Sequence, residues 1–222
     1  SYEKSNKLLD VSGVNKIKCD LEANKIKWVM LRYHKNPKIL STIFDILAGI
    51  YVCIRLIRNY QIGVIHARSY VPAAIALFFK KTANKKFIFD MRGFWVDERV
   101  EGGIWTRGYL YRFAKYLEKV FLLNAATTVT LTEEAKREII SFEYFRVNAP
   151  RIYVIPTCVD LSIFDLNRKF AKDSVDEKLF LEKFIFVYIG SVGTWYEIDG
   201  LYGFFLKAKE SIYNAHLLLL TK

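Results

Sequence analysis

Residues that could do chemistry lie in short polar segments that follow apolar runs. The first, residues 65–69, places a histidine, His66, just before an arginine, Arg68. An imidazole can take or give a proton near neutral pH, and a guanidinium fixes phosphate or carboxylate groups. His66 is therefore a candidate catalytic residue, although a single histidine also commonly serves as a packing or capping residue.

The second segment, residues 90–99, mixes charged and aromatic side chains directly after an apolar run. Carboxylates and guanidinium groups hydrogen-bond sugar hydroxyls, and the rings of Phe94 and Trp95 suit the walls of a site for a polar ring. The alternative interpretation is an ion-paired loop pinned by its aromatics. The candidate binding residues here are Asp90, Arg92, Asp97 and Glu98.

Two further segments carry less specific patterns. Pro156 and Asp160 lie next to a predicted strand end. In residues 190–194, glycines let backbone N–H groups approach a phosphate. The Lys-Ser/Thr ending of a Walker loop is missing there. The candidate phosphate contacts are Gly190, Ser191, Gly193 and Thr194.

The sequence does not indicate metal or redox chemistry. It has no DxD pair, no HExxH pattern and no GxSxG elbow, and its three histidines do not cluster. Cys19, Cys53 and Cys158 are widely spaced and form no CxxC pair. We therefore expect three reduced cysteines in a cytosolic protein, with neither a metal nor another cofactor.

The polar segments follow apolar runs that we expect to form strands, and these runs alternate with helical stretches. Such alternation predicts an α/β fold, a Rossmann-like parallel sheet with helices on both faces and right-handed crossovers. Ligands then bind beyond the carboxyl ends of the strands, where His66, Asp90 and Pro156 fall. We expect strands at 26–31, 63–66, 86–90, 126–131 and 152–155, and helices at 38–59, 71–82, 106–123 and 132–141, the last capped by Thr132.

A second unit begins after a polar connection. Residues 184–189 and 215–220 are apolar runs that predict strands, with a helix at 201–211. We predict a Rossmann-like domain over 1–165, a linker over 166–183 and an incomplete second Rossmann-like domain over 184–222. Because one βαβ unit cannot bury both faces of its sheet, we expect the chain to be a fragment of a longer protein.

The chain is strongly basic, with a net charge of +11 and a pI near 9.4. This charge favours anionic partners, such as phosphorylated metabolites or an anionic membrane surface, or reflects a lysine-rich solvated surface. The basic residues are scattered, which disfavours nucleic acid. The apolar stretch 38–59 contains Asp45 and Arg55, so we expect no membrane-spanning helix but one buried face that includes Ile43 and Leu47.

Five stretches together resemble family 4 glycosyltransferases of the GT-B fold. They are VIHARSYVPAAIA, KFIFDMRGFWVDER, AATTVTLTEEAKREI, RIYVIPTCVDLSIF and FVYIGSVGTWYEIDGLYGFF, in the family's order. The resemblance implies an acceptor-side domain facing a nucleotide-sugar domain across a cleft. It also implies retaining, metal-independent transfer of a sugar from a nucleotide-diphosphate donor to a glycan or lipid-linked acceptor. From the resemblance we expect this transfer to serve surface polysaccharide synthesis, in the cytoplasm or peripherally on the inner face of the plasma membrane.

The matching motifs imply roles for the candidate residues. His66 would lie near the reacting sugar, and Arg68 with the charged residues of 90–99 would line the acceptor side. Pro156 and Asp160 would lie at the crossing between the domains, and the glycine segment would form the loop under the donor phosphates. The paired glutamates of the family's donor domain are missing from this chain, so we expect it to be inactive alone.

Two other functions fit parts of the sequence. The same fold could form a non-catalytic module that binds a nucleotide-sugar or a glycan. A NAD-dependent sugar-nucleotide epimerase would need a Tyr-x-x-x-Lys pair, a spacing that Tyr111 and Lys115 share. The absence of a GxGxxG loop after any predicted strand argues against the epimerase.

Overall fold

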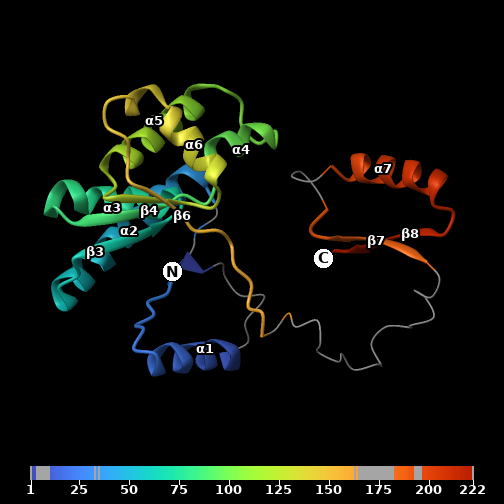
Figure 1. The fold of residues 1–222 in the computed structure, drawn as a ribbon. Coiled ribbons are helices and arrows are strands. Elements are labelled where there is room, and N and C mark those ends of the chain that lie inside the picture. The colour runs from blue at the N-terminus through green and yellow to red at the C-terminus, as the bar shows by residue number, and fades with distance from the viewer. Residues whose placement is uncertain are drawn as a thin grey trace. The chain divides into compact units, whose positions relative to one another are not determined.

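A parallel four-stranded sheet, in the order β3-β4-β5-β6, organises the first part of the chain (Figure 1). The computed structural model describes residues 2–3, 11–32, 34, 36–162, 164, 183–192 and 197–221. Its elements are β1 (Tyr2–Glu3), α1 (Val11–Ala23), β2 (Leu31–Arg32), α2 (Lys38–Tyr60), β3 (Val64–Arg68), α3 (Tyr70–Ala83), β4 (Lys86–Asp90), α4 (Trp95–Glu101), α5 (Tyr109–Asn124), β5 (Thr127–Thr130), α6 (Glu133–Ser141), the 3₁₀ turn η1 (Glu143–Phe145), β6 (Ile152–Val154), β7 (Phe184–Ile189), α7 (Ile198–Ser211) and β8 (Ala215–Leu220).

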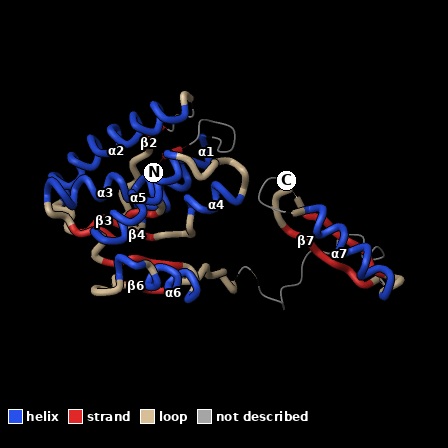
Figure 2. Tube along the Cα trace, turned by 90° about the horizontal axis from the view of Figure 1, so that it is seen from above, coloured by secondary structure: helices blue, strands red, loops and turns tan. Residues whose placement is uncertain are grey.

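Register within this sheet brings the ends of neighbouring strands to one edge. Arg68 lies beside Asp90, and Thr130 lies beside Val154. Helix α3 packs against β3 and β4, α6 packs against β5 and β6, and α2 packs against α3 (Figure 2). The structure therefore confirms the predicted Rossmann-like α/β fold with a parallel sheet flanked by helices.

The core of the sheet is built from aromatic rings on β4 and on the helices beside it. Phe87 and Phe89 are fully buried, and Phe121 of α5 is nearly so. The Phe89 ring meets the edges of the Tyr70 and Phe121 rings at centroid distances of 5.6 and 5.7 Å. Edge-to-face contacts of this kind add to the free energy gained by burying the rings. They tie α3 and α5 to the strand that ends at Asp90.

Most predicted elements of this part are confirmed within a few residues. The residues of β4 match the prediction, and Thr132 caps α6 through its hydroxyl, which accepts the N–H of Ala135 at 3.1 Å. The strand expected at 26–31 is wrong, because only Leu31 and Arg32 pair there, with the two-residue strand β1. A strand extends only as far as it has a partner to hydrogen-bond, which an apolar run alone does not reveal.

Helix α2 departs from its predicted burial. Ile43 and Leu47, expected inside, are 50% and 59% exposed, whereas Ser41 and Asp45 are buried. Asp45 is held by His34, whose Nδ1 lies 2.6 Å from Oδ1. By length and composition, residues Leu40–Tyr60 could cross a membrane, contrary to the expectation, and 17% of the apolar window is buried. The helix passes this test by length and composition only, which is weak evidence for a span, and Leu40, Phe44 and Leu47 give it an exposed apolar face.

Strands β7 and β8 form a separate parallel pair that is joined by α7. Both strands match the predicted residues, and the pairing runs in register from Phe184 beside Ala215 to Ile189 beside Leu220. Among the described residues of this pair and its helix, Ala215 is the one buried apolar side chain.

By its internal contacts, the chain divides into two units: residues 1–94 with 113–156, and residues 95–112 with 157–222. The predicted domain limits at 165 and 184 adjoin residues 165–182, which lie outside the described part of the chain. The domain limits therefore remain a prediction.

Candidate functional site

His66 and Asp90 meet at the carboxyl edge of the sheet. The Nε2 atom of His66 lies 3.3 Å from Oδ2 of Asp90, and the two side chains are 61% and 12% exposed. The carboxylate therefore faces the imidazole from a nearly buried position. The two groups form an ion pair when the imidazole is protonated. A histidine oriented by a carboxylate is a common arrangement for acid–base chemistry.

The backbone around this pair is held by cross-strand hydrogen bonds. The N–H of Ser69 donates to the carbonyl of Asp90, and the N–H of Met91 donates to the carbonyl of Val129, both at 2.9 Å. Ser69 adopts φ 73°, in the left-handed region that a residue with a side chain rarely occupies. Backbone strain of this kind is found at functional sites, where the surrounding structure maintains it.

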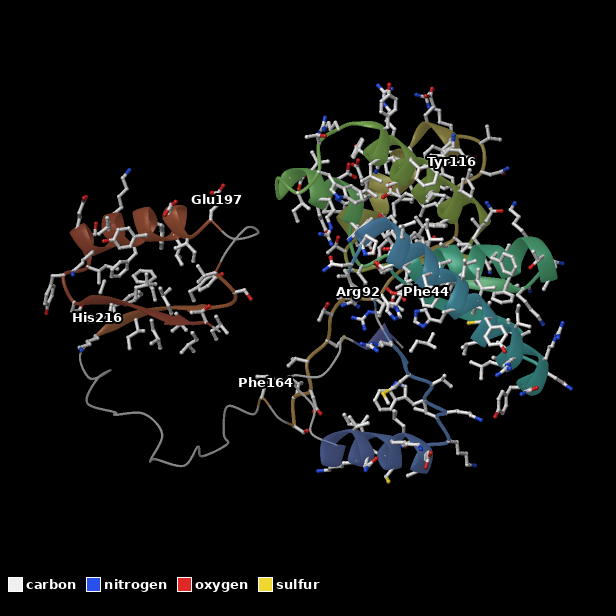
Figure 3. The ribbon with its side chains drawn as sticks, turned by 180° about the vertical axis from the view of Figure 1, so that it is seen from behind. Phe44, Arg92, Tyr116, Phe164, Glu197 and His216 are labelled. Carbon is white, nitrogen blue, oxygen red and sulfur yellow. The ribbon has the colours of Figure 1, made fainter. Side chains whose placement is uncertain are left out.

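Arg68 and Arg92 are exposed beside the same two strand ends. Arg92, which Figure 3 labels, follows Asp90 by two residues. Among the described residues, neither guanidinium forms an ion pair. Both are therefore available to bind an anionic or hydroxyl-rich ligand near His66.

The aromatic part of segment 90–99 is folded differently from the loop that was expected. It forms the short helix α4, with Asp97 and Glu98 in the first turn. Asp97 accepts a hydrogen bond from the Tyr111 hydroxyl at 2.8 Å, and Trp95 packs edge-on to Trp105 at 5.1 Å. Tyr111 of the epimerase-like pair thus binds Asp97. These contacts hold the segment in place, and whether its aromatic side chains also line a binding site stays a prediction.

The candidate residues fall in different units of the chain. His66, Arg68, Asp90 and Arg92 belong to the first unit, whereas Asp97 and Glu98 belong to the second. The structure brings the pair His66 and Asp90 into contact. The proposed acceptor roles of Asp97 and Glu98 remain predictions.

The glycine segment is described only at its beginning. Gly190 follows β7, where its N–H donates to the carbonyl of Leu220 at 3.1 Å. A Cβ there would lie 2.9 Å from the hydroxyl oxygen of Tyr188, which donates to the carbonyl of Ser191, so a larger residue would displace the end of that side chain. Gly193 and Thr194 lie outside the described residues.

Helix α7 presents carboxylates where the donor phosphates were expected. Glu197 precedes the helix, and Asp199 lies in its first turn. Negative side chains compete with an anion for the positive end of the helix. A phosphate would therefore depend on the backbone N–H groups of the preceding loop.

The segment after β6 contains both predicted crossing residues. The division between the units falls just after Pro156. Asp160 is fully exposed, and Oδ1 accepts hydrogen bonds from the Ser162 N–H at 2.9 Å and hydroxyl at 2.7 Å. These hydrogen bonds lower the pKa of Asp160, because they stabilise its charged form.

Sequence reasoning missed a buried charged group on α5. Glu118 of α5 is 1% exposed and accepts a hydrogen bond from Tyr70 at 2.5 Å and another from Lys115. Burial, and then the charge of Glu118, raise the pKa of Tyr144. The signal was present in the pattern, because Glu118 falls in the apolar stripe of α5 with Ala114, Phe121 and Leu122.

No three His, Cys, Asp or Glu side chains in the described ranges lie close enough to hold a metal ion. Metal independence remains a prediction, as does the absence of a cofactor. Cys53 is partly buried, and burial raises the pKa of its thiol. A buried protonated thiol is a weak metal ligand and a weak nucleophile.

Comparison with protein-family models identifies the family to which this sheet belongs. The family model described as Glycosyltransferase Family 4 matches residues 20–163, well over half of the chain. This range contains β3 to β6 and therefore both His66 and Asp90. A search of curated proteins finds no match.

Proposed function

Because this chain belongs to glycosyltransferase family 4, we propose that it acts in retaining, metal-independent transfer of a sugar. The donor is a nucleotide-diphosphate sugar, and the acceptor is a glycan or a lipid-linked glycan of surface polysaccharide synthesis. The observation that carries the proposal is the pairing of His66 with Asp90 at the carboxyl edge of the parallel sheet. In open α/β sheets, ligands bind beyond this edge.

In the proposed reaction, an acceptor hydroxyl oxygen forms a bond to the anomeric carbon of the donor. The bond from that carbon to the diphosphate breaks, the electron pair leaves with the diphosphate, and the hydroxyl proton ends on a diphosphate oxygen. Retention requires both events on the same face of the sugar. His66, oriented by Asp90, hydrogen-bonds a sugar hydroxyl and so fixes the ring for attack.

Charge supplied by the protein stabilises the departing diphosphate. Backbone N–H groups of the segment after Gly190 are the proposed donors to its oxygens. Arg68 and Arg92 would orient acceptor hydroxyls, or the phosphate of a lipid-linked acceptor, beside His66.

The test is a transfer assay on the protein as the cell makes it, with a panel of nucleotide-diphosphate sugars and with membrane extract as acceptor. Replacing His66 by alanine should lower kcat by about 10²-fold, the usual cost of misplacing a reacting group. The matched control is His216→Ala, because His216 is an exposed histidine of β8. EDTA should leave the rate unchanged, and the anomeric proton of the product should show retention by NMR.

Two outcomes would contradict parts of this proposal. Wild-type rates in His66→Ala would contradict the role of the pair. Tight nucleotide-sugar or glycan binding without transfer to any acceptor would instead support the non-catalytic binding module.

We also propose a cytoplasmic location with contact at an anionic membrane surface. The exposed apolar side chains Leu40, Phe44 and Leu47 lie on α2, where Figure 3 labels Phe44. Arg55 and Arg58 are exposed farther along the same helix. An apolar helix face with nearby cations suits the headgroup region of an anionic bilayer.

Vesicle co-sedimentation tests the membrane contact. Binding to vesicles with anionic lipid should be lost at high salt and in Leu47→Glu, whereas Leu206→Glu on α7, also an exposed leucine, should bind normally. Equal binding of wild type and Leu47→Glu would contradict a role for α2.

A further inference from the structure

The buried Glu118 carboxylate joins two segments that carry the candidate site. Its Oε2 accepts the hydrogen bond of Tyr70, the first residue of α3, and its Oε1 accepts that of Lys115. Tyr70 follows His66 by four residues, directly after the strained Ser69. One oxygen of the carboxylate is thus tied to the segment that leaves β3.

The second connection runs through Lys115 to the segment that leaves β4. The Lys115 Nζ lies 5.8 Å from the centroid of the Phe94 ring and 5.7 Å from that of Phe142. The two rings also meet each other edge-on at 6.4 Å. A cation over two ring faces at this range attracts both. Phe94 lies two residues beyond Arg92 and four beyond Asp90.

Stability alone gives little reason for a charge at this position. Replacing a buried ion pair by apolar side chains of similar volume is often neutral or stabilising. Tyr70 is 7% exposed and already packs against Phe89 and Phe121, so the core around it is apolar. The Glu118 carboxylate instead fixes the geometry around it, because each of its two oxygens must meet a hydrogen-bond donor at a defined position.

We propose that Glu118 is a positioning residue that sets the geometry of the His66–Asp90 pair. It fixes the start of α3 through Tyr70 and the segment 91–94 through Lys115 and Phe94. The importance of the pair for sugar transfer rests on the proposed function, but the geometry can be tested without any substrate.

The experiment follows the imidazole resonances in ¹H–¹³C NMR spectra of the whole protein with labelled histidine. The chain has three histidines, and the spectrum of His66→Gln assigns the signal of His66. Tyr70→Phe keeps the ring in its aromatic contacts and removes only the hydroxyl. Lys115→Met keeps the length of the side chain and removes only its charge. Tyr116→Phe is the matched control, since Tyr116 is an exposed tyrosine of the same helix.

Tyr70→Phe and Lys115→Met should each move the resonance of His66 and leave those of His34 and His216 in place. Lys115→Arg, which keeps the cation, should restore the wild-type spectrum more closely than Lys115→Met. A His66 resonance unchanged in both variants, or an equal displacement of all three histidines, would overturn the proposal.

The result is independent of the proposed transfer. A displaced His66 resonance in a protein that transfers no sugar would retain the positioning role and refute the transferase. The reverse result would retain the transferase and refute the role of Glu118.

Discussion

The four-stranded sheet and the β7–α7–β8 segment differ in how far helices bury the side chains of their parallel strands. Both are built from short apolar strands joined by helices. In the first, Phe87 and Phe89 are fully buried under flanking helices. In the second, Phe184 and Ile189 are 51% and 77% exposed, and α7 buries no residue. Similar strand sequences thus reach different burial, because parallel strands need cover on both faces.

The two units into which the chain divides also differ in what shifts the pKa values of their ionisable groups. In the first unit, burial is the main cause of the raised pKa values of Tyr144 and Cys53. In the second unit, the pKa of Asp160 is lowered by hydrogen bonds from Ser162 while the carboxyl stays in water. Exclusion of water therefore shifts the pKa values in the interior, whereas hydrogen bonds from a neighbouring residue shift the pKa at the surface.

The largest effect should come from truncating the core. Phe89→Ala should lower the free energy of unfolding of the first unit by about 3–5 kcal/mol, because it removes a fully buried ring and leaves a cavity. Phe184→Ala, the same change at a half-exposed strand position, should cost much less. Urea unfolding of both variants measures the difference. Equal losses of unfolding free energy would contradict the difference in burial between the two sheets.

A second difference should appear at alkaline pH. The Tyr144 phenol ionises near its ordinary value of 10.0 in the unfolded chain but keeps its proton to higher pH in the folded protein. Above about pH 10, the unfolded chain therefore loses this proton first, and the free energy of unfolding falls as the pH rises. In Tyr144→Phe, the free energy of unfolding should therefore fall less steeply as the pH rises through this range. Unfolding curves measured at several pH values test this. Equal pH dependence would show that Tyr144 is not protected.

Within the first unit, thiol reactivity should distinguish a buried cysteine from an exposed one. Cys53 should react with iodoacetamide at pH 8 more slowly than Cys19, because burial raises the pKa of Cys53 and limits access, whereas Cys19 is exposed. Mass spectrometry of timed digests measures the two rates. Faster alkylation of Cys53 would contradict its burial in α2.

The smallest effect is expected at Asp160. Ser162→Ala removes one of the two hydrogen-bond donors to its carboxylate, so the pKa of Asp160 should rise part of the way toward 3.8. The remaining shift comes from the Ser162 N–H, which the substitution keeps. Carboxyl ¹³C NMR measures the titration, and an unchanged midpoint would assign the whole shift to the backbone.

Much of the architecture followed from periodicity and from the order of apolar runs. Strands β4, β7 and β8 match their predicted residues, because each is a short run that pairs along its whole length. Periodicity also detected α2 but misassigned its faces. The spacing of apolar residues shows that a helix has an apolar face, whereas its neighbours decide whether that face is covered.

The site was predictable in its position and less so in its contacts. The rule that ligands bind at the carboxyl edge of a parallel sheet pointed to His66 and Asp90, and register then brought them together. Helix α4 was missed because Phe94 and Trp95 suggested the walls of a binding site. Glu118 pairs with Lys115, three residues away on the same helix, and with Tyr70 of α3, 48 residues away, and no local pattern specifies the second contact.

The central claim is that His66 and Asp90 act as one unit in sugar transfer. Its most direct test is the kcat/KM of the protein as the cell makes it, compared for the wild type, His66→Ala, Asp90→Asn and the double variant. If Asp90 acts through His66, the double variant should be no slower than His66→Ala, because the loss of the imidazole removes what Asp90 orients. Losses that add fully, or wild-type rates in either single variant, would contradict the account.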